Sequence, residues 1–381
     1  MTRTKVAHLS SVHPPRDPRI VLKECSTLAA AGMDVVYVCP HTRDENVSGV
    51  RVRAVPLRRG RLSRVTATVL DVWKTALRER PAIFHIHDPE LLPLAILARF
   101  AGHRVVYDVH EDLPLQVLAK HWIPRTLRPA MAWAAKWLER LAARTLSGIV
   151  AATPQIGARF PAATTVVVQN FVMVDELAVP APTPYSERPS SFVYIGGIAA
   201  IRGAIEMVAA IGAVPAHLGA RLALAGPVSH AALAAEMERH HGWKRVDFHG
   251  WQSRAEVAGH LHRARAGILV IHPTENYLES YPVKLFEYMA VGLPVIVSDF
   301  PLWRALIGGV GCAIFVNPLD AKEIAAAMTW ILEHPSEAAR MGAKGPAAAR
   351  DRFNWDVEAE KLLAFYRTLI PINRAPMSGS H

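Results

Sequence analysis

Glu279 and Glu287 lie eight positions apart in a polar stretch that runs into a predicted helix, and their residue type suits sugar recognition. Each carboxylate oxygen can accept a hydrogen bond from a neighbouring sugar hydroxyl. Lys284 lies between them, in the first turn of a helix expected to begin near Pro282, where its charge adds to the positive end of the helix dipole and favours a phosphate. Taken alone, two glutamates on a solvated helix edge are more often surface charges.

A second candidate site lies in the segment FVYIGGIAAIRG, residues 192–203, which reads as a strand, a glycine turn and the start of a helix. Gly196 and Gly197 let a backbone come close to a ligand. Arg202 precedes a helix whose free N–H groups can bind a pyrophosphate. On its own, a glycine pair after a strand is usually just a turn.

The loop SSVHPPRDPRI, residues 10–20, follows the first predicted strand. Asp17 and Pro18 are expected to cap and open the next helix. Arg16 and Arg19 are expected at the rim of a cleft, where a guanidinium could meet a phosphate of a donor or an acceptor.

Two clusters of histidines and carboxylates end later predicted strands, at residues 85–88 and 108–112. The order His-x-His-Asp could begin a metal-ligand set. Such sets draw on further histidines at defined spacing, and the ends of strands also supply polar residues to a cleft, so we predict no metal site. Asp88 and Glu90 are expected to serve mainly as helix caps.

The segment 115–145 follows an amphipathic helical pattern. It carries a basic stripe bordered by tryptophans, formed by Lys136, Arg140, Arg144, Trp133 and Trp137. Such a helix suits anionic lipid headgroups. It could equally pack on a sheet with its arginines in solvent, and the sequence leaves both alternatives open.

Short β-branched runs alternate with helical patterns along the chain, which predicts an α/β fold with parallel sheets. In the first half, strands are predicted at 4–10, 34–39, 82–87, 104–109, 147–152 and 165–169, and helices near 17–32, 63–79, 89–101 and 126–145. Later strands are predicted near 192–196, 221–225, 245–249, 266–271, 294–297 and 312–316. Two facing parallel sheets would place a ligand cleft between them.

We expect an N-terminal domain over 1–175, a proline- and serine-rich linker over 176–191 and a second domain over 192–354. The remaining residues, 355–381, are expected to form a helix that could cross back to the first domain, followed by a frayed tail.

The 381 residues include 51% hydrophobic and 20% charged side chains, which excludes a disordered chain. The net charge is +10, and residues 1–175 carry the whole basic excess, so the first domain is expected to face something anionic. A βαβ pattern without an RNA motif or a helix-turn-helix disfavours nucleic acid. Isolated cysteines, no signal peptide and no run of ~18 apolar residues predict a cytoplasmic protein, soluble or peripheral on the inner face of the membrane.

The segment 279–296, ESYPVKLFEYMAVGLPVI, resembles the Glu, seven residues, Glu signature of family 4 glycosyltransferases. The glycine loop at 192–203 and the HPPRDPRI loop are similar to segments of the same family, and the resemblance covers nearly the whole chain. It implies a GT-B architecture, in which two Rossmann-like domains face a central cleft. It also implies retaining transfer from a nucleotide sugar without a metal ion or other cofactor.

The resemblance also implies roles for single residues. Gly196, Gly197, Arg202 and Lys284 would hold the donor phosphates, Glu287 the ribose and Glu279 the hexose. His110 would orient sugar and acceptor, and it completes the predicted catalytic set with Glu279, Arg202 and Lys284. Weaker acceptor contacts are predicted from Arg16, Arg19, Asp88 and Glu111. The family often has a further basic residue after the glycines, and here that position falls at or near Ile198, a charge that Lys284 could replace.

The expected activity is transfer of a hexose from a UDP- or GDP-sugar to a saccharide acceptor, in polysaccharide or glycoconjugate biosynthesis. The basic first domain favours a lipid-linked acceptor on an anionic membrane. Two alternatives remain open at this point. One is a nucleotide-sugar 2-epimerase on the same fold, and the other is a non-catalytic partner subunit of a glycan assembly complex.

Overall fold

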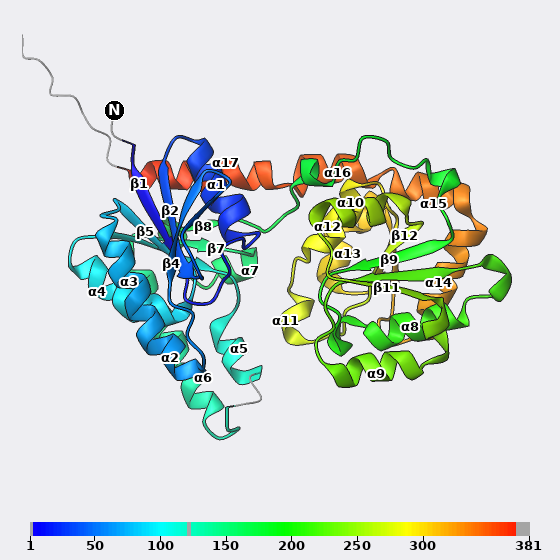
Figure 1. Cartoon of the computed structure of the whole chain (residues 1–381), viewed down its shortest axis with the longest axis horizontal. Coiled ribbons are helices and arrows are strands. Elements are labelled where there is room, and N and C mark those ends of the chain that lie inside the picture. The colour runs from blue at the N-terminus through cyan, green and yellow to red at the C-terminus, as the bar shows by residue number, and fades with distance from the viewer. Residues whose placement is uncertain (1–2, 120–122, 371–381) are drawn as a thin grey trace, which may run out of the picture. The chain divides into compact units, whose positions relative to one another are not determined.

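The computed structural model describes residues 3–119 and 123–370, and the chain divides into two compact units (Figure 1). Unit 1 comprises Met1–Asn170 and Glu358–His381, and unit 2 comprises Phe171–Val357. The segment expected to act as a linker packs on unit 2, where Leu177 is buried and the Tyr185 hydroxyl donates to the carbonyl of Arg265 over 2.8 Å.

The described part of unit 1 forms an eight-stranded sheet in the order β3-β4-β2-β1-β5-β6-β7-β8. Neighbouring strands pair in parallel, as predicted, except for the unpredicted antiparallel hairpin of β3 and β4. Ser48 and Gly49, both at positive φ, make its two-residue turn. The strands are β1 (Lys5–Leu9), β2 (Asp34–Pro40), β3 (Glu45–Val47), β4 (Val50–Val55), β5 (Ile83–Ile86), β6 (Arg104–Val109), β7 (Gly148–Ala151) and β8 (Thr165–Val167).

Successive side chains of these strands point to opposite faces of the sheet. One face is apolar and packs against α3 (Val69–Arg78), α4 (Leu92–Phe100) and α6 (Arg128–Thr145). The helices on the other face include η1 (Ile20–Cys25), α1 (Ser26–Ala30) and α17 (Trp355–Leu369) (Figure 1). That second face carries the polar residues of the site described below.

The described part of unit 2 forms a six-stranded parallel sheet in the order β11-β10-β9-β12-β13-β14. Its strands are β9 (Ser191–Ile195), β10 (Arg221–Ala225), β11 (Val246–Gly250), β12 (Ala266–Leu269), β13 (Val295–Ser298) and β14 (Ala313–Val316). The main helices are α8 (Ala204–Ala213), α9 (Ala231–Arg239), α10 (Arg254–Arg263), α12 (Val283–Ala290), α13 (Pro301–Ile307), α14 (Ala321–Glu333), α15 (Pro335–Gly342) and α16 (Gly345–Arg352). Both units therefore show Rossmann-like alternation of strands and helices.

Candidate functional site

The glycine loop of unit 2 follows β9, at the end of the sheet where α/β proteins bind ligands. Gly196 has φ +117°, and a Cβ atom there would lie 2.2 Å from Cε of Lys284 and 2.7 Å from its Nζ. A Cβ on Gly197 would meet the guanidinium of Arg202 at 3.0 Å. A side chain at position 196 would therefore displace Lys284, and one at position 197 would press on Arg202.

Arg202 and Lys284 concentrate positive charge at the loop. Arg202 donates from Nη1 to the carbonyl of Gly197 over 3.1 Å, and its Nε lies 3.4 Å from the Tyr277 hydroxyl. Burial and repulsion from Arg202 lower the pKa of Lys284, although Glu287 opposes them. Two cations are thus kept within electrostatic reach of each other, which favours an anionic ligand between or beside them.

Two tyrosines that the sequence reasoning missed hold the loop in shape. The Tyr194 hydroxyl donates to the carbonyl of Gly197 over 2.9 Å, and the Tyr288 hydroxyl accepts from the N–H of Ile195 over 3.2 Å. Both rings are fully buried. An aromatic in the strand before the glycines, and another in the Glu-Tyr-Met run, were the available signals.

The two glutamates of the sequence motif have different surroundings. Glu279 is exposed, directly after the short helix α11 (Glu275–Leu278). Glu287 lies on α12 and is buried, with its Oε1 accepting from Nη1 of Arg254 over 2.8 Å. Arg254 also pairs with Glu176, and the sequence reasoning did not identify it.

Ile198 is fully buried and carries no charge, at the position where the resemblance leads one to expect a basic residue. The ammonium of Lys284 comes from another element to the neighbouring Gly196. That Lys284 replaces the missing charge stays a prediction.

In unit 1, Asp88 organises the loop after β1. Its Oδ2 accepts from the Ser10 hydroxyl and from the N–H of Ser11, each over 2.7 Å, and its Oδ1 lies 3.5 Å from His13. The prediction that Asp88 acts mainly as a helix cap is wrong, because its carboxylate makes no capping hydrogen bond to η3 (Pro89–Leu91). It holds the loop instead.

Asp17 caps the helix as predicted, although the helix itself begins at Ile20. Its Oδ1 accepts from the N–H groups of Arg19 and Ile20, and its Oδ2 lies 3.0 Å from Nδ1 of His13. Burial alone would raise the pKa of Asp17, but the hydrogen bonds from His13 and the Ile20 N–H bring it down to about 2.

Arg19 is not at a rim, so that prediction is wrong. Its side chain is only 5% exposed and forms a two-pronged pair with Asp108, with contacts of 3.0 and 2.7 Å. It also donates to the carbonyl of Val168 and lies 3.1 Å from Glu24. An arginine so deep in the unit stays charged because carboxylates surround it.

His110 lies just beyond β6 and is partly exposed. Its Nε2 lies 2.7 Å from Oδ2 of Asp108, and its ring stacks on that of His13 at 5.3 Å between centroids. Burial would raise the pKa of Asp108, but Arg19 and His110 hold it well below its usual range. Asp108 is therefore an anion that holds His110 in place.

The remaining predicted acceptor residues are on the surface. Arg16 is exposed and pairs with Glu45 over 2.9 Å, and Glu111 is exposed next to His110.

Two groups of side chains in unit 1 have ligand atoms close enough to consider a metal ion. His8, Glu24, His85 and His87 form one, and His87, Asp108 and His110 form the other, with ligand atoms within 4.8 Å of one another. The ring nitrogens already make hydrogen bonds within these groups. His8 Nδ1 lies 2.9 Å from His87 Nε2, and His87 Nδ1 lies 3.1 Å from Oδ2 of Asp108. A cation would have to replace these hydrogen bonds.

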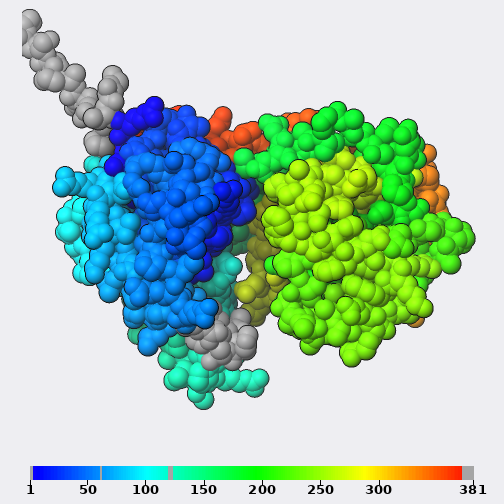
Figure 2. All heavy atoms as spheres, viewed as in Figure 1, coloured from blue at the N-terminus to red at the C-terminus, as the bar shows by residue number. Residues whose placement is uncertain are grey.

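The outer surface of α6 is both basic and apolar. Trp133 and Trp137 are 64% and 46% exposed. Beside them lie exposed side chains of both kinds, Leu127, Met131, Leu141, Lys136, Arg140 and Arg144. This segment belongs to the teal surface at the bottom of Figure 2. The buried residues of this helix are three alanines and Glu139, and Leu138 packs partly buried against the core, whereas its other large apolar side chains are left in solvent.

Among the described residues, no helix combines the length and the apolar composition needed to cross a membrane. Trp122, which the sequence places near this surface, lies outside the described residues.

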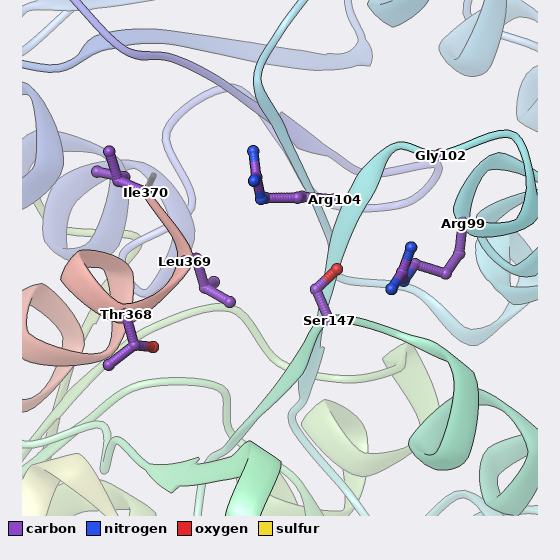
Figure 3. A pocket seen from close by; sticks show the side chains of 7 residues that line it. All are labelled: Arg99, Gly102, Arg104, Ser147, Thr368, Leu369 and Ile370. Atoms are coloured by element: carbon purple, nitrogen blue, oxygen red, sulfur yellow. The ribbon is translucent and has the colours of Figure 1, made fainter. Parts of the chain in front are cut away.

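A separate pocket of about 440 Å³ opens at the amino ends of β6 and β7, beside the end of α17 (Figure 3). Its lining includes Arg99, Arg104 and Ser147. None of the predicted site residues lines it, and His110 lies at the opposite end of β6.

Both halves of the chain match models of known families. Residues 19–171 match the model described as "Glycosyl transferase 4-like domain", and residues 180–348 match the one described as "Glycosyl transferases group 1". The chain belongs to the family 4 glycosyltransferases. It is therefore an enzyme, a glycosyltransferase that acts on nucleotide sugars, as predicted.

Similar proteins and solved structures cover nearly the full length of the chain. Glycogen synthase of Mycobacterium tuberculosis is 25% identical over 378 residues, covering 90% of this chain and 88% of that protein. Sucrose-phosphate synthase of Thermosynechococcus elongatus has a similar structure, with TM-score 0.76, 19% identity, and coverage of 96% and 99%. The Anabaena protein HepE in complex with UDP-glucose gives TM-score 0.71, 15% identity, and coverage of 96% and 100%. The predicted fold class, α/β of the GT-B type with two Rossmann-like domains, is confirmed.

Proposed function

We propose that this family 4 glycosyltransferase moves a hexose from a UDP- or GDP-sugar to a saccharide acceptor, with retention of anomeric configuration and without a metal ion. The observation that carries the proposal is the pair of cations, Arg202 and Lys284, beside the Gly196–Gly197 loop. When the sugar leaves, negative charge grows on the β-phosphate of the donor, and a preorganised pair of cations stabilises that charge.

The neighbouring carboxylates supply the remaining donor contacts. We assign the ribose hydroxyls to Glu287, whose Oε1 is already oriented by Arg254, and the hexose to the exposed Glu279. The first N–H groups of α8, which follows Arg202, add donors for the pyrophosphate.

Retention follows if bond making and breaking occur on one face of the sugar. The bond from the anomeric carbon to the phosphate oxygen breaks, and the acceptor oxygen bonds to the same carbon. The acceptor proton passes to the leaving phosphate oxygen. In unit 1, His110 would orient sugar and acceptor hydroxyls, and Arg16 and Glu111 are the exposed candidates for acceptor binding, whereas Arg19 and Asp88 support the loops from inside.

A lipid-linked acceptor is the second part of the proposal. It is supported by the exposed surface of α6, where Trp133 and Trp137 lie beside three basic side chains. Aromatic and basic residues together suit the headgroup region of an anionic membrane. Unit 1 would then rest on the cytoplasmic membrane surface and receive its acceptor there.

The donor site is tested by nucleotide binding and turnover. A thermal-shift and calorimetry screen across nucleoside diphosphates and their sugars should begin with UDP-glucose, because HepE binds it. Arg202→Ala and Lys284→Met should each weaken nucleotide binding about 10- to 100-fold, the loss of one charge-assisted contact. Arg239→Ala and Lys322→Met at exposed positions of unit 2 are the matched controls.

Three outcomes would contradict the donor proposal. The first is unchanged nucleotide binding in Arg202→Ala. The second is activity that EDTA abolishes and one metal ion restores. The third is conversion of the donor sugar without any acceptor, which would make the enzyme an isomerase. Product anomeric configuration, read by NMR, tests retention separately.

Membrane contact is tested by co-sedimentation with vesicles of phosphatidylglycerol and phosphatidylcholine. Reversing Lys136, Arg140 and Arg144 to glutamate should weaken binding at least about 100-fold, at about 1 kcal/mol for each basic residue. The same change at Arg239, Lys322 and Arg350, which are exposed in unit 2, should have a much smaller effect. Binding that ignores both anionic lipid and the α6 reversals would refute this part.

A further inference from the structure

The pocket at the amino ends of β6 and β7 is lined by two arginines whose charges are not balanced within the described part of the chain. Arg99 comes from the last turn of α4, and Arg104 is the first residue of β6. Neither guanidinium makes a hydrogen bond or an ion pair with another described residue. No residue that lines the pocket is acidic. Two positive charges therefore border one cavity without a counter-charge.

This lack of partners sets Arg104 apart from the other arginines on the described strands of the same sheet. On β4, Arg51 pairs with Asp34 and Glu79, and Arg53 pairs with Asp44 and Glu79. In Arg99 the atom Nε is buried and still has no hydrogen-bond partner among the described residues. Buried N–H groups of native proteins are almost always paired, so a water molecule or an anion from solution has to meet this one.

Ser147 adds a neutral donor to the same pocket. Its Oγ accepts from the N–H of Val105 over 3.1 Å, and its own hydrogen has no acceptor among the described residues. Figure 3 shows the Ser147 side chain between those of Arg99 and Arg104. The lining therefore offers three side chains with free donors to one ligand.

These donors favour a phosphate group. The planar fork of an arginine matches phosphate oxygens, and two guanidiniums balance the charge of about −1.5 to −2 that a phosphate monoester carries at pH 7. The pocket volume of about 440 Å³ is in the range of small-molecule sites. Since one water molecule takes about 30 Å³, this volume exceeds what a phosphate group alone needs. The pocket has room for a small organic group bonded to the phosphate.

We propose that this pocket is a binding site for a phosphate monoester, held by Arg99, Arg104 and Ser147. The proposal is independent of the proposed function, because no donor or acceptor residue assigned above lines the pocket. Thr368, Leu369 and Ile370 form one of its walls, at the end of α17. A ligand bound here therefore ties the end of that helix to α4 and β6.

Calorimetry of the full-length protein with inorganic phosphate and with glucose 1-phosphate is the direct test. A background of Arg202→Ala with Lys284→Met removes the other pair of cations that could bind phosphate. In that background, Arg99→Met and Arg104→Met should each weaken binding about 10- to 100-fold, as expected for loss of a charge-assisted contact.

Two further variants serve as controls for this measurement. Arg99→Lys keeps the charge but not the fork, so it should retain part of the affinity. Arg78→Met should leave it unchanged, because Arg78 is exposed in the last turn of α3 and does not line the pocket. Without phosphate, Arg99→Met and Arg104→Met should keep the wild-type Tm, since neither guanidinium has a partner among the described residues.

Hydrogen exchange locates the bound ligand. In the same background, glucose 1-phosphate should slow amide exchange at residues 102–105 and 366–370 and leave residues 196–204 unchanged. Protection confined to residues 196–204 would place the phosphate at the glycine loop and overturn the proposal.

The phosphate could belong to a soluble ester or to a lipid headgroup, and vesicles distinguish the two sources. Phosphatidic acid presents a monoester, whereas phosphatidylglycerol presents a diester. Glucose 1-phosphate binding that is lost in Arg99→Met assigns the site to a soluble ester. A preference for phosphatidic acid that is lost in Arg99→Met, without binding of glucose 1-phosphate, assigns it to a headgroup. If Arg99→Met and Arg104→Met alter neither measurement, the site is refuted, whatever the outcome of the nucleotide-sugar assays.

Discussion

Lys284 depends on a residue that has no side chain. Its last methylene group and its ammonium lie only 2.2 and 2.7 Å from where a Cβ atom on Gly196 would be, so the position of the cation and the identity of the glycine cannot be varied separately. The same is true, less tightly, of Arg202 and Gly197. The donor site therefore depends on the two glycines as well as on the two cationic side chains.

Gly196→Ala should mimic the loss of Lys284. The new methyl group would displace the ammonium, so we expect nucleotide binding about 10- to 100-fold weaker, measured by calorimetry. Backbone strain at positive φ adds a stability cost of about 1 kcal/mol. Gly102→Ala has a similar φ of +93° with nothing within 4 Å, so it should show the strain alone and bind nucleotide normally.

Glu139 gives a pH-dependent prediction. Burial raises its pKa to about 7, although Arg159 opposes the shift. The folded state therefore keeps a proton that the unfolded state loses above about pH 4.5, and wild-type stability falls as pH rises through this range. Relative to wild type, Glu139→Gln should gain about 3 kcal/mol in the free energy of unfolding between pH 4.5 and pH 8.

Urea unfolding at the two pH values measures this difference. Glu236→Gln, at an exposed position of α9, is the control. A Glu139→Gln curve parallel to that of wild type would show that Glu139 is ionised in the folded protein.

At the scale of single residues, the sequence allowed the cations and glutamates of unit 2 to be predicted because they follow one another along a recognisable motif. Arg254 was missed because it reaches the site from another element, α10, and no spacing connects it to the motif. Tyr194 lies in the strand before the glycines, but only the structure shows that its hydroxyl donates back to the loop. Arg19 was misplaced because a loop arginine is normally exposed, and only the fold shows that a buried Asp108 lies beneath it.

Helices and strands were predicted well where the hydrophobic periodicity of the sequence is strong. They were predicted poorly where a functional surface alters that periodicity. The strands of both sheets followed from β-branched runs, and the alternation along β1, β5 and β6 puts His8, His85 and Asp108 on one face. The β3–β4 hairpin was missed although β4 alternates apolar and charged residues, because β3 has only three residues and shows no period of its own. On α6 the apolar residues were a poor guide to burial, since alanines are its buried apolar residues and, apart from the partly buried Leu138, the large ones are exposed.

The outer apolar residues of α6 can be tested for function without loss of stability. Met131→Ser and Leu141→Ser together should change the free energy of unfolding by less than about 1 kcal/mol, because both side chains are exposed. The same pair should weaken binding to anionic vesicles in co-sedimentation. Ala142 is buried on the face towards the sheet, so Ala142→Asp should lower the free energy of unfolding several-fold more than the serine pair does. Vesicle binding unaffected by the serine pair would argue against insertion of these side chains.

At the scale of the whole molecule, the chain forms unit 1 from two separate stretches and unit 2 from one. Residues 171–357 are continuous, whereas the first sheet needs α17, whose Leu362 and Tyr366 are fully buried. The sequence predicted that the last helix could return to the first domain. The exact residues at which the chain passes from one unit to the other, Asn170 and Val357, depend on packing and were not predictable from composition.

Fragments should reflect this difference. A fragment of residues 171–357 should fold cooperatively, as judged by near-UV circular dichroism and a sharp urea transition. A fragment of residues 1–170 should not, because removal of two buried side chains from its core costs several kcal/mol, typically about 2–5 for each large one. Adding a synthetic peptide of residues 355–370 should restore its structure, and cooperative folding of 1–170 alone would contradict the expectation.

The discontinuity of unit 1 also sets an order of events during synthesis. Its strands leave the ribosome first, but the helix that covers their polar face is among the last segments made. At about 5–20 residues per second, the intervening stretch takes roughly 10 to 40 s to translate. During that time His8, His85 and His87, which lie on that face, are open to water and free to take up protons, so their final hydrogen bonds can form only after unit 2 is complete. The newborn N-terminal half is accordingly the part of this protein that chaperones should hold longest.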